Sequence, residues 1–273
     1  MGGILYLVST PIGNLEDITL RAIRVLREAD LIACEDTRQT RKILDHLGLA
    51  KAAVSYHEHN EAARAPELTE KLKGGANIAL VSDAGTPLVS DPGYRLVNAA
   101  IEAGILVVPI PGPSAALGAL TASGLPTDSF RFCGFLPARQ SQRQKLLDEL
   151  RTESCTLIFY EAPHRILETL ADIEQVLGDR DVVVARELTK LHEEFLRGTA
   201  NSVRQELSIR PSVKGEITLL IGKAGQSEPG STLDPKEEVR ALEEQGIARM
   251  DAVKQVAKAR GIPKRELYRR VIE

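Results

Sequence analysis

The sequence contains no tryptophan and few other aromatic residues. Five Phe and five Tyr make up 4% of its 273 residues. The hydrophobic core must therefore be built mainly from aliphatic side chains, and few rings remain on which nucleic-acid bases could stack. If the protein binds a nucleic acid, charge and shape should decide recognition more than stacking.

Cysteine is also scarce, and the three residues, Cys34, Cys133 and Cys155, lie far apart. An odd number without a Cys-x-x-Cys pair argues against a disulfide framework and against a zinc knuckle, so we expect buried thiols. His57 and His59 flank Glu58, but no further ligand follows at a spacing typical of metal sites. We therefore predict no metal site.

Long hydrophobic runs are absent from the sequence. No segment approaches the ~18 apolar residues that a membrane-spanning helix needs. The first apolar stretch lacks a basic segment before it and is ended early by Pro11, which favours a β-strand over a signal peptide. We expect a cytoplasmic protein without a membrane partner.

The charge of the chain is unevenly distributed. Its 35 basic and 38 acidic residues give a formal net charge of −3, which by itself argues against nucleic-acid binding. Residues 247–272, however, hold eight basic and two acidic residues, so this end carries +6 and the rest of the chain −9. The basic end indicates either a nucleic-acid contact or a solvated terminal helix.

The first 112 residues alternate apolar runs with amphipathic segments. The runs are rich in Ile, Leu and Val, as in strands covered on both faces. They span residues 4–9, 31–36, 78–83 and 105–111, and the predicted helices span 19–29, 38–47, 61–73 and 93–103. Thr37 and Asn60 are expected N-caps, and Gly48 and Gly104 expected helix ends. This βαβ rhythm predicts an α/β domain with a mainly parallel sheet over 1–112.

A second α/β domain is predicted over 113–222. Its expected strands are 131–136, 155–161, 181–186, 194–197 and 216–222, and its expected helices are 142–151, 163–177 and 202–208. The runs at 182–187 and 194–198 are too close in sequence for a helical crossover, which favours a hairpin and a mixed sheet.

The remainder of the chain is predicted to be a linker followed by a small helical tail. Residues 223–233 are rich in Gly, Ser and Pro, which is typical of linkers. Helices are expected at 235–245, 249–260 and 264–272, with a turn at Gly261-Ile262-Pro263 in the manner of a helix-turn-helix. The predicted tail spans 234–273.

Four loops rich in Gly and Pro follow the predicted strands of the first domain, at 9–17, 35–38, 82–93 and 111–116. The carboxyl ends of parallel strands are where open α/β sheets bind ligands. None of the loops is a Walker A or a Gly-x-Gly-x-x-Gly motif, no Gly-x-Ser-x-Gly elbow is present, and Asp83 and Asp91 would repel a pyrophosphate. Such loops suit a ligand with hydroxyls and a positive centre, such as an adenosyl sulfonium. Taken singly, each could equally be an ordinary turn.

Seven ordered segments give the chain a family resemblance. They are TPIGNLEDITLRA (10–22), CEDTRQTRKIL (34–44), SDAGTPLVSDPG (82–93), PIPGPSA (109–115), GFLP (134–137), FYEAPHR (159–165) and RELTK (186–190). Together they closely resemble the ribosomal small-subunit RNA methyltransferase I family of the tetrapyrrole methylase superfamily. Members of that family use S-adenosylmethionine to methylate the ribose 2′-oxygen of a cytidine in 16S ribosomal RNA.

The resemblance implies two α/β domains with the methyl donor in the cleft between them, a homodimer, and small-subunit RNA or the ribosomal subunit as partner. It also implies a set of donor-binding residues. These are Pro11, Asp83, Gly85, Thr86, Ser114, Ala115, Leu136, Tyr160, Glu161, Leu188, Gly215 and Glu216.

Candidates for handling the hydroxyl proton are Asp36, Glu161, Glu187 and Lys190, which stand in loops expected at the cleft. A carboxylate could accept the proton. Lys190 could do so only with a lowered pKa, or could stabilise developing alkoxide charge. Each could instead be a structural ion-pair partner of a neighbouring arginine.

Basic residues beside the cleft and in the tail are candidates for RNA binding, because phosphate contacts supply much of nucleic-acid affinity. They are Arg38, Arg41, Arg139, Arg143, Arg165, Arg186, Lys254, Lys258, Arg260, Lys264, Arg265, Arg269 and Arg270. Two alternatives stay open: a tetrapyrrole methylase, and a non-catalytic RNA-binding protein on the same fold.

Overall fold

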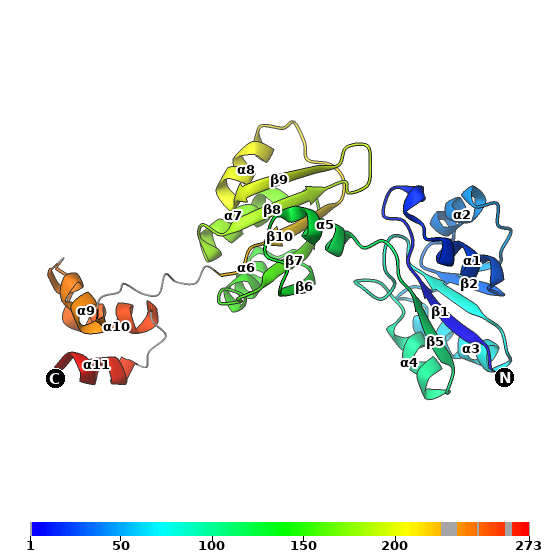
Figure 1. Cartoon of the computed structure of the whole chain (residues 1–273), viewed down its shortest axis with the longest axis horizontal. Helices are drawn as coiled ribbons and strands as arrows, with labels where there is room; N and C mark the ends of the chain where they lie inside the picture. The colour runs from blue at the N-terminus through cyan, green and yellow to red at the C-terminus, as the bar shows by residue number, and fades with distance from the viewer. Residues whose placement is uncertain (1, 225–233, 245, 260–263, 273) are drawn as a thin grey trace.

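The computed structural model describes residues 2–224, 234–244, 246–259 and 264–272. Two five-stranded sheets, each with helices on both faces, are followed by three short helices (Figure 1). Within these residues, no helix has the length and apolar character that crossing a membrane requires.

The first sheet is parallel throughout, in the order β3-β2-β4-β1-β5. Its strands are β1 (Ile4–Val8), β2 (Leu31–Cys34), β3 (Ala53–Ser55), β4 (Ile78–Val81) and β5 (Leu106–Ile110). The connecting helices are α1 (Leu20–Glu28), α2 (Thr37–His46), α3 (Glu61–Lys73) and α4 (Tyr94–Glu102), and Leu15–Asp17 form a 3-10 turn.

Alternation along β1 explains why helices cover both faces of this sheet. Val8 packs with Val25 and Leu26 of α1, whereas Leu5 packs with Leu68 and other residues of α3 and α4. Since side chains alternate across a strand, an apolar run without polar interruptions must be buried on both sides. The predicted parallel α/β domain is confirmed.

The second sheet is mixed, in the order β6-β7-β10-β8-β9, and only β6 and β7 run parallel. Its strands are β6 (Phe130–Phe135), β7 (Thr156–Glu161), β8 (Asp181–Arg186), β9 (Glu194–Thr199) and β10 (Ile217–Ile221). Its helices are α5 (Ala115–Ser123), α6 (Gln140–Glu149), α7 (Ile166–Leu177) and α8 (Ala200–Ser208). The β8–β9 pairing is the predicted hairpin.

Two helix starts differ from the sequence-based expectation. Asp36, not Thr37, caps α2, because its carboxylate accepts a hydrogen bond from the Arg38 N–H at 2.8 Å. Asn60 precedes α3, but its side-chain oxygen accepts from the N–H of His57 at 2.9 Å and so braces the preceding loop. Gly48 and Gly104 follow their helices with φ of 64° and 69°, as expected of C-terminal glycines.

The tail comprises α9 (Pro235–Glu244), α10 (Arg249–Ala259) and α11 (Lys264–Ile272). These helices share a small core of their own, which includes Val239, Val253 and Leu267. The turn predicted at 261–263 and most of the predicted linker lie outside the described residues. We propose the domain division 1–112 and 113–222, because α5 packs on β7, β8 and β10 of the second sheet.

Candidate functional site

The loops that follow β1, β4 and β5 are hydrogen-bonded to one another. Thr10 and Gly85 exchange backbone hydrogen bonds of 2.9 and 3.0 Å. The Thr86 hydroxyl donates to the carbonyl oxygen of Pro113 at 3.2 Å. Parallel strands end at one edge of the sheet, so these bonds connect three loops there into one surface.

Backbone strain is concentrated in two loops beside this surface. Leu88 and Ser90 in the loop after β4 have φ of 69° and 64°, and Glu187 and Thr189 after β8 have φ of 54° and 66°. In the described ranges these are the four non-glycine residues with positive φ. Each such conformation costs on the order of 1–3 kcal/mol and persists where the surroundings impose it, commonly at functional sites.

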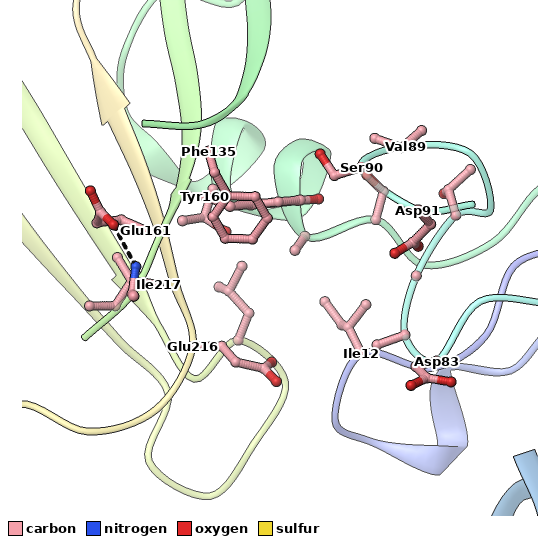
Figure 2. Close-up of a pocket in the computed structure, with 18 of the residues that line it drawn as sticks. Ile12, Asp83, Val89, Ser90, Asp91, Phe135, Tyr160, Glu161, Glu216 and Ile217 are labelled. Atoms are coloured by element: carbon pink, nitrogen blue, oxygen red, sulfur yellow. Dashed lines mark hydrogen bonds between the residues drawn. The ribbon is translucent and has the colours of Figure 1, made fainter. Parts of the chain in front are cut away.

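A cavity of about 380 Å³ lies between the two sheets at these loops, a volume typical of small-molecule sites. Figure 2 shows Ile12, Asp83 and Asp91 on one wall, and Glu161, Glu216 and Ile217 on the opposite wall. The first domain therefore supplies one wall of the cavity and the second domain the other.

Ten of the twelve residues predicted to bind the donor line this cavity. They are Asp83, Gly85, Thr86, Ser114, Ala115, Tyr160, Glu161, Leu188, Gly215 and Glu216. Pro11 and Leu136 are buried and are not part of the lining; Leu136 packs in the core of the second sheet. Their neighbours Ile12 and Phe135 line the cavity in their place.

The remaining lining residues are not among those that the motifs predict to bind the donor. They are Ile12, Ala84, Val89, Ser90, Asp91, Phe135, Ala162, Pro163, Ile217 and Thr218. Most stand inside the motifs already quoted, so the motifs locate the loops. Which side chains of a loop turn inward depends on its three-dimensional course.

The wall from the first domain is acidic. Burial, together with the negative charges of Glu35 and Asp83, raises the pKa of Asp91 to about 6. Asp83 itself accepts a hydrogen bond from the N–H of Asp36 at 2.9 Å. A wall that carries these negative charges favours a ligand with positive charge.

Two of the proton-handling candidates are engaged by arginines. Asp36 does not line the cavity, and hydrogen bonds from Arg38 lower its pKa to about 2. Glu161 is buried and accepts from the Arg165 guanidinium, from the Thr169 hydroxyl at 2.7 Å and from the backbone N–H of the next residue at 2.7 Å. Both carboxylates therefore serve as ion-pair partners in this structure.

Glu187 and Lys190 are engaged by each other. The Lys190 ammonium donates to Glu187 at 2.9 Å and to Glu216 at 3.0 Å. Burial lowers the pKa of Lys190, but these two hydrogen bonds outweigh burial and raise it overall. The hydrogen bond from Lys190 likewise lowers the pKa of Glu187. Lys190 is thus a cation and lacks the lowered pKa that a base would need.

The side chains of the candidate RNA-binding residues differ in their exposure to solvent. Six have side chains at the surface: Arg38, Arg41, Arg139, Lys254, Lys264 and Arg269. Arg165 and Arg186 are partly buried and paired with Glu161 and Glu194. The side chains of Lys258, Arg265 and Arg270, and all of Arg260, lie outside the described residues.

Arg143 requires a correction, because it is not available to an RNA strand. Its side chain is 1% exposed, and its Nε donates to Asp172 at 2.7 Å. Its Nη1 donates to the carbonyl oxygens of Pro137 and Ala138 in the loop after β6. This arginine therefore holds the loop after β6 against α7 instead of presenting charge to solvent.

No group of three or more His, Cys, Asp or Glu side chains that could hold a metal ion occurs among the residues with described positions. Cys34 and Cys155 are buried and Cys133 is half-buried, all three as free thiols.

Comparison with known proteins gives relatives of both sequence and fold. Residues 4–204 match the family described as Tetrapyrrole (Corrin/Porphyrin) Methylases. The chain is 52% identical to "Ribosomal RNA small subunit methyltransferase I" of Halalkalibacterium halodurans, over 97% of this chain and 93% of that one. It is 49% identical to the protein of the same name from Synechocystis, over 99% and 98% of the two chains.

Solved structures share the fold at low sequence identity. Uroporphyrin-III-C-methyltransferase from Thermus thermophilus superposes with a TM-score of 0.55 at 24% identity, covering 81% of this chain and 95% of the other. Diphthine synthase superposes with a TM-score of 0.62 at 16% identity, covering 81% and 90%. These two likenesses concern the fold alone.

Proposed function

Because the chain belongs to the ribosomal RNA small subunit methyltransferase I family, within the tetrapyrrole methylases, we propose that it transfers a methyl group from S-adenosylmethionine to the ribose 2′-oxygen of a cytidine in 16S ribosomal RNA. The observation that carries the proposal is identity near 50% over nearly the whole chain, tail helices included, to proteins named for that RNA. The tetrapyrrole enzymes among the solved structures are far less similar.

The cavity has the chemistry that the proposed methyl donor requires. S-adenosylmethionine supplies a methyl group activated by a positively charged sulfur. Asp83 and Glu216 bring negative charge to the cavity wall, and Thr86 and Ser90 add hydroxyl groups. Tyr160, Phe135, Leu188 and Ile217 offer apolar surface. Gly85 has a φ of 84°, which side chains rarely adopt, and a methyl group on it would lie 3.3 Å from the side chain of Ile12, which also lines the cavity.

RNA binding is supported by exposed cations and by the composition of the tail. Arg38 and Arg41 project from α2 and Arg139 from the start of α6, while Lys254, Lys264 and Arg269 are exposed on the tail. A porphyrinoid needs only a few pocket arginines to meet its carboxylates, whereas an RNA strand rewards a charged surface spread over many residues.

We also propose that the protein acts in the cytoplasm as a homodimer. Exposed apolar side chains on α4 and the edge strand β5 support self-association. Tyr94 is 73% exposed, Ile101 59% and Leu106 60%. Large apolar side chains gathered on neighbouring elements are typical of protein interfaces.

The test is mass-spectrometric mapping of small-subunit RNA after incubation with the protein and isotopically labelled donor. A single 2′-O-methylated cytidine is expected. Methyl transfer to a porphyrinoid and not to RNA would favour the tetrapyrrole alternative. RNA binding without detectable donor binding by calorimetry would favour a non-catalytic protein.

A further inference from the structure

Among the described residues, no cation pairs with the Asp91 carboxylate in the cavity wall. Asp91 lines the cavity, and the groups that set its pKa are burial, two acidic residues and one hydroxyl, with no lysine, arginine or histidine among them. The other acidic groups near the cavity are committed. Glu161 is paired with Arg165, Glu216 with Lys190, and Asp83 with the backbone N–H of Asp36.

The neighbours of Asp91 come from three elements. Glu35 at the end of β2 and Asp83 at the end of β4 bring negative charge, and the Ser82 hydroxyl partly opposes their effect. Tyr160 of β7 is close enough that the charge of Asp91 contributes to the raised pKa of its phenol. Beyond Glu35 stand Glu58 and His57, which act on Glu35 with opposite signs. Asp91 therefore sits in a negative field at the junction of both domains.

The loop holds Asp91 in a fixed position. Ser90, directly before it, and Leu88 have positive φ. Gly93, two residues later, has φ of 144° and packs so closely that a methyl group on it would lie 2.9 Å from a Leu80 methyl. A carboxylate on such a constrained loop is placed without the conformational averaging that weakens a general base on a flexible one.

We propose that Asp91 is the general base of the reaction: its carboxylate accepts the proton of the ribose 2′-hydroxyl. As the hydroxyl oxygen forms its bond to the methyl carbon, the O–H bond breaks and the proton passes to Asp91. The methyl–sulfur bond breaks at the same time, and its electron pair stays on sulfur, which becomes a neutral thioether. This inference rests on the function proposed above and adds the residue that removes the proton.

The chemistry favours Asp91 over the other acidic residues. A base works best when its pKa lies near the working pH, because it is then both ionised and able to hold a proton. Burial and the negative neighbours of Asp91 raise its pKa toward that value, whereas arginine and lysine partners lower the pKa values of Asp36 and Glu187.

The experiment is single-turnover methylation of purified small subunits with saturating donor between pH 5 and 9. It compares the wild type, Asp91→Asn and Glu35→Gln. The wild-type rate should rise with an inflection near pH 6 and then level off. Asp91→Asn should lower the plateau by about 10²–10⁴-fold, the usual contribution of a general base, and abolish the inflection. Glu35→Gln removes a neighbouring negative charge, so it should keep the plateau and move the inflection to lower pH.

Two measurements without turnover separate this role from donor binding and from folding. Calorimetry should give Asp91→Asn a donor affinity within about threefold of the wild type. Because its pKa is raised in the folded state, Asp91 stabilises the protein below the pKa of the unfolded chain, and that stability is lost as the pH rises through 6. Asp91→Asn should therefore raise the melting temperature relative to wild type at pH 8 more than at pH 4.

The outcomes distinguish the two proposals. If the wild type forms 2′-O-methylcytidine and Asp91→Asn does so at the same rate, the role of Asp91 is wrong and the proposed function stands. If donor affinity falls by the same factor as the rate, Asp91 is a donor ligand and not a base. If the wild type methylates a nucleobase atom of the RNA, the proposed 2′-O reaction is wrong. The role of Asp91 as general base for the 2′-hydroxyl is then wrong as well. A wild type without activity on small subunits overturns both.

Discussion

Replacement of Arg143 should lower the denaturant concentration at which the second domain unfolds. It should leave the charge that the protein presents to RNA unchanged. In Arg143→Ala, the carboxylate of Asp172 would lose its ion pair, and the carbonyl oxygens of Pro137 and Ala138 would lose their donors. Both side chains of the ion pair are 1% exposed. Removal of one partner from such a pair costs about 3–5 kcal/mol, because a buried charge is left uncompensated.

For Asp172 we expect a cost near the lower end of this range, because two of its hydrogen-bond donors remain. Gln140 and Gln144 donate to its Oδ1 at 3.0 and 2.7 Å and remain in the variant. Only Oδ2 would be left without a partner, so we expect a loss of about 3 kcal/mol. With a urea m-value of about 1–3 kcal/mol per molar, the midpoint should fall by roughly 1–3 M. The double variant Arg143→Met/Asp172→Leu should recover most of the loss, since apolar replacement of a whole buried pair is often neutral.

The assay is urea unfolding followed by circular dichroism, with Arg139→Ala as the matched control. Arg139 lies just before the same helix but is exposed, and exposed substitutions usually change stability by no more than about 0.5 kcal/mol. Salt-dependent RNA binding provides the second readout. If Arg143→Ala keeps wild-type stability and lowers the salt slope by about 1, as loss of a phosphate contact does, our placement of Arg143 is wrong.

The stability difference between wild type and Arg143→Ala should also depend on pH. Burial raises the pKa of Asp172, but hydrogen bonds from Gln140, Gln144 and Arg143 outweigh burial and lower it overall. A group with a lowered folded-state pKa stabilises the protein above its unfolded pKa, about 4 for Asp, and that stability is lost as the pH falls below it. The difference between wild type and Arg143→Ala should therefore shrink below about pH 4.

Three further predictions concern the cavity and the tail. A methyl group on Gly13 would lie 2.5 Å from Cγ of Lys190 in the second domain. Overpacking of this kind costs about 1–3 kcal/mol. Gly13→Ala should therefore weaken donor binding by roughly 5–150-fold. Calorimetry of Gly13→Ala/Lys190→Ala should show partial recovery, and no recovery would contradict the steric explanation. Phe135 lines the cavity with a 58% exposed ring, so Phe135→Ala should weaken RNA binding by about 1–3 kcal/mol, the value of one stacked base. Phe130→Ala, on the same strand but outside the cavity, should leave RNA binding unchanged. Equal losses of RNA affinity in the two variants would refute stacking of a base on Phe135. Removing 234–273 should weaken subunit binding and flatten its salt dependence without changing donor affinity; unchanged filter-binding curves would exclude the tail from the interface.

The elements that periodicity could not predict are those whose sequence pattern does not reveal which residues are buried. The helix Ala115–Ser123 is composed of Ala, Leu, Gly, Thr and Ser with little difference between its faces, so it carries no helical stripe for a sequence to reveal. The strand Ala53–Ser55 has three half-buried residues at the sheet edge, too few for an alternating pattern. By contrast, helices such as α1 and α2 bury one clear face, and both were predicted to within two residues at each end.

The roles of charged residues were the hardest to predict, because a role depends on a partner that is remote in sequence. Arg143 appears in the sequence as one more cation of a basic segment, yet its partner Asp172 lies 29 residues away. Asp91 presents the opposite case. It stands in a motif among turn residues, and the fold brings the negative charge of Glu35 beside it, with no cation paired to it in the part of the chain that the structure describes. Motifs could therefore locate the loops that form the cavity. Whether a charge in those loops is paired, and so structural, or unpaired, and so free to act on a substrate, is decided by tertiary contacts that no local pattern encodes.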